Sequence, residues 1–367
     1  MTSGSARAAT RHAPPLHVIE TLKARLTAEP APLAGELVLG RSNAEVFTTI
    51  ADTSDDPVVI AAALRETLNV YSSRSSQKRA PDAELERVLL KHLRSPNPAV
   101  LAAALSAARI PLMTATPSEA ITSAICDATR SERDASTRAA ALEALSLLRP
   151  DRRGAQVLTA FEQALAAGEP RLLSLALLAL SQSGLSLATL PRDAHDRLAA
   201  RVLELARHWD PGVRGRSLAV LAEVEELAPA DSRFSAGREH LADPNGYVRA
   251  QAADLLLRCR EPMAIHALID LAGDLAEARY ELSGFTTLDG NAGTLLHVVP
   301  GRPRVADAAL LAMLTLSQVA PGVTPLALTL AGRASPEALV LQNADAARLW
   351  YLSAAPRIPR TAQAKSP

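Results

Sequence analysis

The chain has 367 residues, a mass of 38.7 kDa and a pI near 7.1, with 39 basic and 39 acidic residues. This balance argues against a general binder of nucleic acids or anionic membranes, which normally carries a net basic face. Hydrophobic residues make up 48% of the chain and aromatic residues 3%. This composition excludes disorder for most of the chain and favours a core of Leu, Ala and Val in close-packed helices.

The first residues of the chain predict a disordered tail over 1–15. This segment carries Arg7 and Arg11, contains no acidic residue and ends in Pro14-Pro15. No apolar segment typical of a secretory signal follows it, and the chain holds no continuous apolar run of about 20 residues. We therefore expect a cytoplasmic protein without a membrane partner. Residues 16–52 are expected to form the first helices and the N-terminal cap of the fold.

A nine-residue pattern recurs along the chain and predicts a repeat architecture. Its copies are separated by 41, 37, 35, 41, 35 and 57 residues, and they begin at Asp56, Asn97, Asp134, Glu169, Asp210, Asn245 and Arg302. A polar residue followed by Pro, as in Asp210-Pro211, is typical of a helix start, because the side chain caps the helix and Pro fits its first position. The eighth position is Ala in six of the seven copies, and the ninth is Leu in six. These positions predict the buried stripe of a helix in each copy.

A second amphipathic segment precedes several of these helices. Examples are Asp82–Arg94, Ser118–Arg130, Arg192–His208 and Ser232–Leu241. Each unit is therefore predicted to be a helix, a tight turn and a second helix. We expect one all-α, right-handed α-solenoid of about seven to eight helical pairs over residues 16–353.

These units resemble HEAT repeats, whose turn pattern is Asp-Pro-x-Val-Arg. The pattern stands in this chain as Asp210-Pro211-Gly212-Val213-Arg214. The resemblance implies that the turn Asp and Arg side chains bridge adjacent repeats as a structural ladder. The candidate ladder residues, from the closest copy to the weakest, are Asp210 with Arg214, Asp243 with Arg249, and Asp134 with Arg138. The remaining copies lack the Arg, so the resemblance implies a broken ladder there.

The step of 57 residues contains an insertion at residues 282–301. Two β-prone runs, Arg279–Thr287 and Thr294–Val299, flank the turn-forming residues Asp289-Gly290 and Gly293. We expect a β-hairpin-like insertion that projects from the solenoid. Because solenoid insertions often lie on the binding face, its apolar side chains are candidate partner-binding residues, namely Tyr280, Phe285, Leu288 and Leu295. The alternative is that they pack on the neighbouring helices.

The end of the chain predicts one further helix over Pro336–Leu352. Its expected core positions hold Gln342 and Asn343, so it is not a regular repeat. A polar-faced terminal helix keeps a solenoid soluble, and we expect Trp350 and Tyr351 to seal the end of the core. Residues 354–367 are expected to form a disordered tail.

No catalytic motif accompanies this architecture. The chain has no P-loop, dinucleotide-binding, serine-hydrolase or zinc-protease motif, and no Cys pair with metal-ligand spacing. We therefore predict no catalytic residue, no metal and no cofactor. The predicted function is a non-enzymatic protein-protein interaction scaffold whose curved surface presents the second helices of successive repeats to a partner protein.

Two alternatives to this function remain open. The first is a HEAT-like nucleic-acid-binding or DNA-glycosylase-type protein, which the aromatic and acidic run His208-Trp209-Asp210 would suit. The neutral charge of the chain argues against it. The second is a HEAT-like lyase or chaperone that acts on a partner protein.

Overall fold

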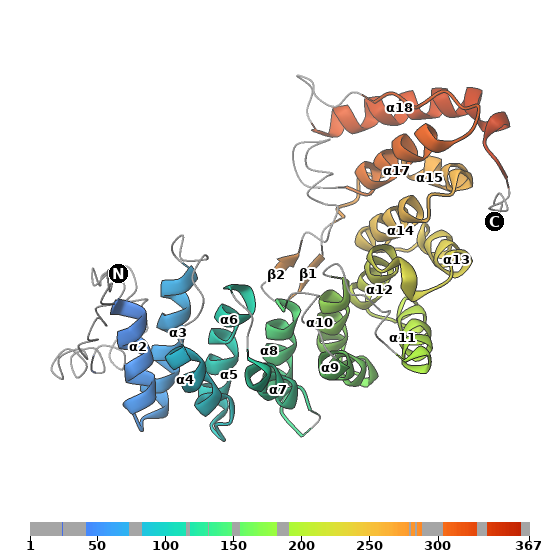
Figure 1. Ribbon diagram of the computed structural model, residues 1–367. Helices are drawn as coiled ribbons and strands as arrows, with labels where there is room; N and C mark the ends of the chain where they lie inside the picture. Colours follow the sequence, from blue (N-terminus) through green and yellow to red (C-terminus); the bar gives the residue numbers. More distant parts are fainter. Residues whose placement is uncertain are drawn as a thin grey trace, which may run out of the picture. The chain divides into compact units, whose positions relative to one another are not determined.

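The computed structural model describes residue 24 and residues 42–72, 83–114, 118–130, 132–148, 155–181, 191–278, 280–282, 285–287, 304–328 and 336–360. The chain divides into two compact units, residues 1–149 and residues 150–367. Apart from one two-stranded sheet, the secondary structure of the described residues is helical (Figure 1). None of their helices combines the length and hydrophobicity that a bilayer crossing requires. The predicted tail 1–15 lies outside the described residues.

The first unit contains three helical pairs among its described residues. They are α2 (Ser42–Thr53) with α3 (Pro57–Ser72), α4 (Ala83–Leu93) with α5 (Pro98–Ala107), and α7 (Glu119–Ala128) with α8 (Ala135–Ser146). The short helix α6 (Arg109–Thr114) follows α5. Helix α3 packs on α5, and α5 packs on α8. The second helices of successive pairs therefore form one continuous row.

The second unit contains four more pairs. Three are α9 (Ala155–Ala166) with α10 (Pro170–Ser181), α11 (Arg192–Leu205) with α12 (Pro211–Glu223), and α13 (Ala230–His240) with α14 (Gly246–Cys259). In the fourth pair, η6 (Pro262–Ala264), α15 (Ile265–Leu268) and η7 (Ile269–Leu271) take the place of the first helix, and α17 (Val305–Val319) is the second. The short η5 (Glu225–Leu227) precedes α13, and α18 (Pro336–Ala354) with η8 (Ala355–Arg357) follows α17. Helices α10, α12, α14 and α17 pack on one another in that order.

The buried stripe predicted from the repeat is confirmed. The seven residues of the eighth position are all 0% exposed, namely Ala63, Ala104, Ala141, Ala176, Ser217, Ala252 and Ala309. The residues of the ninth position are at most 2% exposed. Small side chains at the eighth position let the backbones of neighbouring second helices approach closely, and the larger side chains at the ninth fill the space beside them.

Six of the seven second helices begin at the residue that the repeat predicts. Asp210 caps one of them, because its Oδ1 accepts the N–H of Val213 at 3.0 Å. The seventh prediction is wrong by two residues, since α17 begins at Val305 rather than at Pro303. Its cap comes from inside the helix, where Asp307 Oδ2 accepts the backbone N–H of Arg304 at 2.8 Å.

The predicted form of the insertion is not supported. The structure pairs β1 (Tyr280–Leu282) with β2 (Phe285–Thr287) as a short antiparallel hairpin. Both strands come from the run Arg279–Thr287 that the sequence analysis treats as one strand. The run is therefore divided between two strands, and Ser283 and Gly284 between them lie outside the described residues. The partner run Thr294–Val299 lies outside the described residues.

The C-terminal helix is confirmed and extends two residues beyond its predicted end. Trp350 is half-buried, and its indole N–H donates to the carbonyl of Thr324 at 2.7 Å. The described helical structure continues past residue 353, because η8 follows α18 and Ile358 is buried. Part of the predicted tail therefore packs on the fold through the apolar side chain of Ile358.

Replacing Gly215 by Ala is expected to destabilise the second unit. Gly215 lies inside α12, beneath the buried ring of Tyr247 from α14, and an added Cβ would come within 2.5 Å of the Tyr247 Cδ1 atom. We expect the unfolding free energy to fall by about 1–3 kcal/mol through overpacking, although Ala favours helix formation over Gly. Gly168→Ala is the matched control, because no atom lies within 4 Å of the Cβ added there. Equal effects of the two substitutions in chemical denaturation would contradict this packing.

Candidate functional site

The four predicted partner-binding residues are not brought into a described surface. Tyr280 begins β1 and Phe285 begins β2. Leu288 and Leu295 lie outside the described residues. The interface role of this insertion therefore stays a prediction.

Arg214 links two successive turns of the second unit. Its Nε and Nη2 donate to the two carboxylate oxygens of Asp243 at 2.8 and 2.9 Å. Its Nη1 donates to the carbonyls of His208 and Trp209, both at 2.9 Å. One guanidinium therefore fixes its own turn through the backbone and reaches the next turn through a bidentate ion pair.

The same arrangement recurs one turn later. Arg249 Nε donates to Asp274 Oδ2 at 2.7 Å, and Arg249 Nη1 donates to the carbonyl of Asp243 at 2.7 Å. The acceptor Asp274 was missed by the sequence analysis, because no Pro follows it and the turn pattern is absent there. The sequence carries one signal for Asp274: it closely follows the segment that takes the place of the first helix in the seventh pair.

Among the described residues, no such link is found for the third predicted pair. Asp134 caps α8, since its Oδ1 accepts the N–H of Thr137 at 2.9 Å. Arg138 has a buried Nε without a hydrogen-bond partner among the described residues. Among the described residues, the Arg–Asp links between successive turns therefore join the turns at 210, 243 and 274.

One large aromatic side chain is exposed to solvent at the first of these turns. Trp209 is 74% exposed, although its own carbonyl and that of His208 are fixed by Arg214. The His208 and Trp209 rings lie 5.3 Å apart. Trp209 therefore lies on the rim of a turn, and the alternative of a nucleic-acid site around His208-Trp209-Asp210 stays a prediction.

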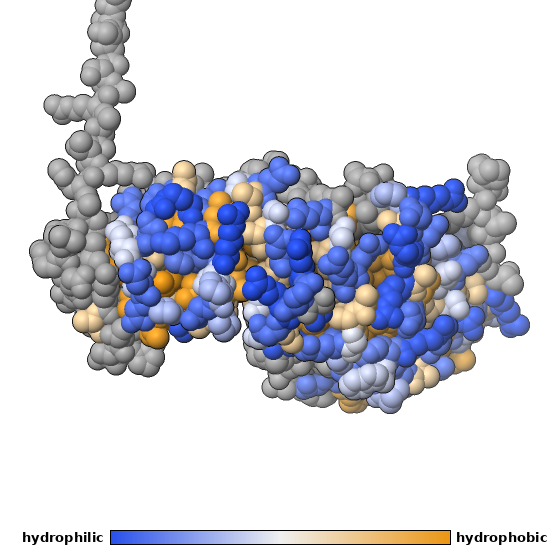
Figure 2. All heavy atoms as spheres, turned by 90° about the horizontal axis from the view of Figure 1, so that it is seen from below, coloured by the Kyte–Doolittle hydropathy of each residue, from blue (hydrophilic) through white to orange (hydrophobic). Residues whose placement is uncertain are grey.

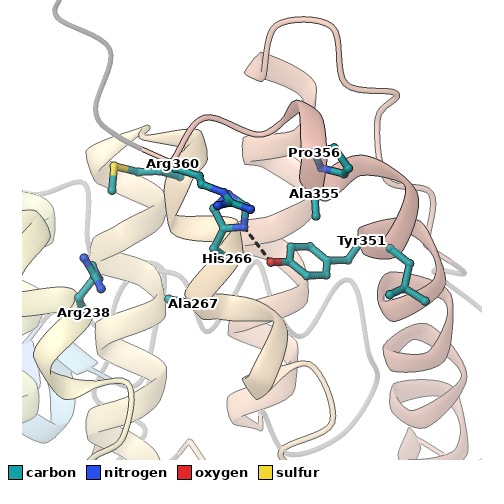
Figure 3. Close-up of a pocket in the computed structure, with 9 residues that line it drawn as sticks. Arg238, His266, Ala267, Tyr351, Ala355, Pro356 and Arg360 are labelled. Carbon is teal, nitrogen blue, oxygen red and sulfur yellow. Dashed lines mark hydrogen bonds between the residues drawn. The ribbon is translucent and has the colours of Figure 1, made fainter.

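A pocket of about 590 Å³ lies at the C-terminal end of the second unit (Figure 3). Arg238 of α13 stands on one side of it, and Tyr351 of α18 on the other. Of its nine lining residues, five are apolar, namely Met263, Ala267, Leu352, Ala355 and Pro356. Leu352 is 74% exposed, and Leu349, three residues earlier on the same helix, is 71% exposed.

The charges around this pocket are of one sign. Arg238 and Arg360 line it, and no Asp or Glu does. Both side chains are solvent-exposed, and neither forms an ion pair in the part of the chain that the structure describes. The pocket therefore combines an apolar lining with two cationic groups that are free to bind an anion.

His266 fixes the wall that carries Arg360. Its Nδ1 lies 2.7 Å from the Tyr351 hydroxyl, and its Nε2 lies 3.4 Å from the carbonyl of Ile358. In the tautomer that suits both contacts, Nε2–H donates to the carbonyl and Nδ1 accepts from the phenol. The imidazole thus ties α15, α18 and the segment after η8 together, two residues before Arg360.

A second pocket of about 360 Å³ lies on the other side of α13, against α11. Arg207 and Glu239 form a bidentate ion pair across it at 2.8 and 2.7 Å. His240 also lines it, and burial lowers the pKa of its imidazole despite the nearby carboxylates. The second pocket is therefore built on first helices, and the first is built on two first-helix segments and the terminal helix α18, whereas the partner surface was predicted on second helices.

Neither pocket could have been identified from the sequence. The first assembles Arg238, His266, Tyr351 and Arg360, which belong to separate elements and share no motif. Within the described ranges, no three His, Cys, Asp or Glu side chains are grouped so that they could hold a metal ion. The site is therefore characterised by its shape and charge.

Comparison with known proteins identifies the fold. The sequence matches no family model and no curated protein sequence. The structure is similar to that of the karyopherin Kap121p bound to the SUMO protease Ulp1p, with a TM-score of 0.54 and 14% identity over 94% of this chain. Kap121p bound to Nup53p gives a TM-score of 0.53 at 14% identity, again over 94% of this chain.

These similarities confirm a helical solenoid of the HEAT and armadillo type. The chain spans 37% of the length of Kap121p in both structures. At this level of identity the similarity concerns the fold alone.

Proposed function

We propose that this chain is a non-enzymatic scaffold that binds a partner protein through the pocket between α13, α15 and α18. The observation that carries the proposal is the pocket itself, where apolar side chains and two free arginines surround a space of about 590 Å³. Concave sites that combine an apolar lining with a few placed polar groups are typical of ligand recognition.

The surface next to the pocket supports a protein as the ligand. Leu349 and Leu352 are neighbours on one face of α18 and are largely exposed. Figure 2 shows one face of the molecule, on which hydrophilic side chains predominate and hydrophobic ones form small separate patches. Leu349 and Leu352 place exposed apolar surface beside the pocket, which a partner protein could cover.

The fold agrees with this proposal. Kap121p has the same type of fold and binds other proteins, including the SUMO protease Ulp1p. A stack of helical pairs offers an extended surface of this kind without any catalytic group. Because this chain spans only 37% of Kap121p, the identity of the partner does not carry over.

The test compares a pocket variant with a matched surface variant. Leu352→Asp places a charge at the rim of the pocket, and Val58→Asp places the same charge at a 60% exposed position in the first unit. Proteins captured on the immobilised wild-type chain from the source organism are purified, and their dissociation constants are measured for all three baits. A partner that loses affinity for the Leu352 variant alone supports the proposal.

Two results would contradict it. The first is a purified partner that binds all three baits equally, which would place the interface elsewhere. If replacing Ser283–Pro300 by a Gly/Ser linker then abolishes binding of that partner, the predicted insertion interface is favoured. The second is specific capture of nucleic acid rather than protein.

A further inference from the structure

We infer that the pocket between α13, α15 and α18 recognises an acidic segment of a partner protein in which Asp or Glu residues alternate with large apolar residues. This inference rests on the proposed function and specifies the chemistry of the partner. It is carried by two arginines that have no ion-pair partner among the described residues and that lie beside an apolar lining in one pocket.

The arginines define the charge of the ligand. Arg238 lies in the last turn of α13, where a cation also interacts favourably with the helix dipole. Arg360 lies beyond the end of η8, so the dipole gives no reason for its position. A ligand carboxylate would supply both guanidinium groups with the ion-pair partner that the described residues do not supply.

The apolar lining of the pocket defines the rest of the ligand. Met263, Leu352 and Pro356 present apolar surface beside the arginines. Met adapts its shape to different apolar side chains, which suits a peptide-binding surface. A free inorganic anion would leave this surface uncovered, whereas an apolar residue next to the acid would bury it.

The geometry also favours a peptide over a nucleic acid. Tyr351 and His266 are the two aromatic rings among the lining residues, and their edge-on contact has an interplanar angle of 80°. The Tyr351 hydroxyl is hydrogen-bonded to the imidazole of His266. This contact fixes the orientation of the phenol ring, so the ring does not lie free to stack on a base. Figure 3 shows Tyr351 pointing from α18 toward His266.

The rigidity of the site allows it to select its ligand. His266 bonds both Tyr351 and the backbone at Ile358, so Arg360 follows a segment that is already anchored. A preformed wall reduces the ordering cost of binding. The two charges can therefore discriminate between ligands with little rearrangement.

The experiment measures binding of fluorescein-labelled peptide pools by anisotropy to the full-length chain. The peptides have eight residues and amidated C-termini, so side chains provide their only carboxylates. One pool alternates Asp or Glu with Leu, Ile or Phe, a second has Asn or Gln at the acidic positions, and a third has Ser at the apolar positions. A single-stranded oligonucleotide of equal charge and inorganic phosphate serve as competitors.

We expect the acidic-apolar pool to bind, and the other two pools to bind about tenfold more weakly or worse. The double variant R238Q/R360Q should lose about the same factor, and raising the salt to 1 M should weaken binding through screening. Arg357→Gln is the matched control, because Arg357 is exposed on η8 and does not line the pocket. Its affinity for the acidic-apolar pool should match that of the wild-type chain.

Several results would overturn the inference. Equal binding of the amide pool would exclude recognition of the carboxylate, and equal loss in the Arg357 variant would indicate a diffuse charge effect. Stronger binding of the oligonucleotide, or full displacement by millimolar phosphate, would assign the arginines to another anion. If a purified partner loses affinity for the Leu352→Asp variant but binds R238Q/R360Q normally, the proposed function stands and this inference fails.

Discussion

Replacing Asp243 by Ala is expected to lower the unfolding free energy of the second unit by about 3–5 kcal/mol, the cost of leaving one charge of a buried pair without its partner. The side chains of Arg214 and Asp243 are only 13% and 6% exposed. Burial opposes ionisation of Asp243, yet the hydrogen bonds from Arg214 and from the backbone of Asn245 hold its pKa below its ordinary value. The substitution removes the anion to which all of these donors are directed.

A second ion pair in the same unit provides the control. Arg207 and Glu239 form a bidentate pair of similar length, but their side chains are 68% and 42% exposed. Glu239→Ala should therefore cost less than about 1 kcal/mol. Urea denaturation of the wild-type chain and the two variants measures the difference. Similar losses in both variants would show that burial of the Arg214 link contributes nothing.

Asp307 is expected to make the chain less stable as the pH rises from about 4 to 7. This carboxyl group is 2% exposed, and burial raises its pKa to about 6, although the Arg304 N–H and side chain act in the opposite direction. The folded state therefore binds this proton more tightly than the unfolded state. Its contribution to stability is complete below the unfolded pKa of 3.8 and is lost as the pH passes through about 6.

The substitution Asp307→Asn isolates this contribution. Asn retains an oxygen that can accept the N–H of Arg304 but does not ionise in this range. The difference in unfolding free energy between wild type and variant should shift by about 3 kcal/mol in favour of the variant between pH 4 and pH 7. Denaturation curves at each pH give this difference directly, because other titrating groups are common to both proteins. A difference that is independent of pH would contradict burial of the ionised group.

The repeat made most of the fold predictable. Ala176 and Leu177 occupy positions whose side chains must be buried in every copy, so two aligned columns located the core of seven second helices. Prediction was less accurate where one local signal competed with another. Pro303 resembled the start of a helix, but the buried Asp307 capped α17 at Arg304 instead.

The candidate site was not predictable by the same means. Local periodicity specifies which face of a helix is buried, but it does not specify which side chains of distant helices meet. Arg238 and Arg360 lie 122 residues apart in the sequence and reach one pocket only because α13, α15 and α18 pack at one end of the unit. The exposed leucines of α18 gave no signal either, since a terminal helix was expected to be polar on its outer face.

The links made by Arg214 and Arg249 have a consequence for how the second unit opens. In a repeat protein each pair contacts only its neighbours, so segments can unfold separately when the contacts between them are weak. Here largely buried ion pairs join the turns at 210, 243 and 274, so they link the three pairs that begin with α11, α13 and η6. Amide hydrogens in α12, α14 and α17 should therefore exchange with solvent through one common opening event. Since α13 and α15 also form the pocket, a bound ligand would slow exchange throughout this block rather than only at the residues it touches.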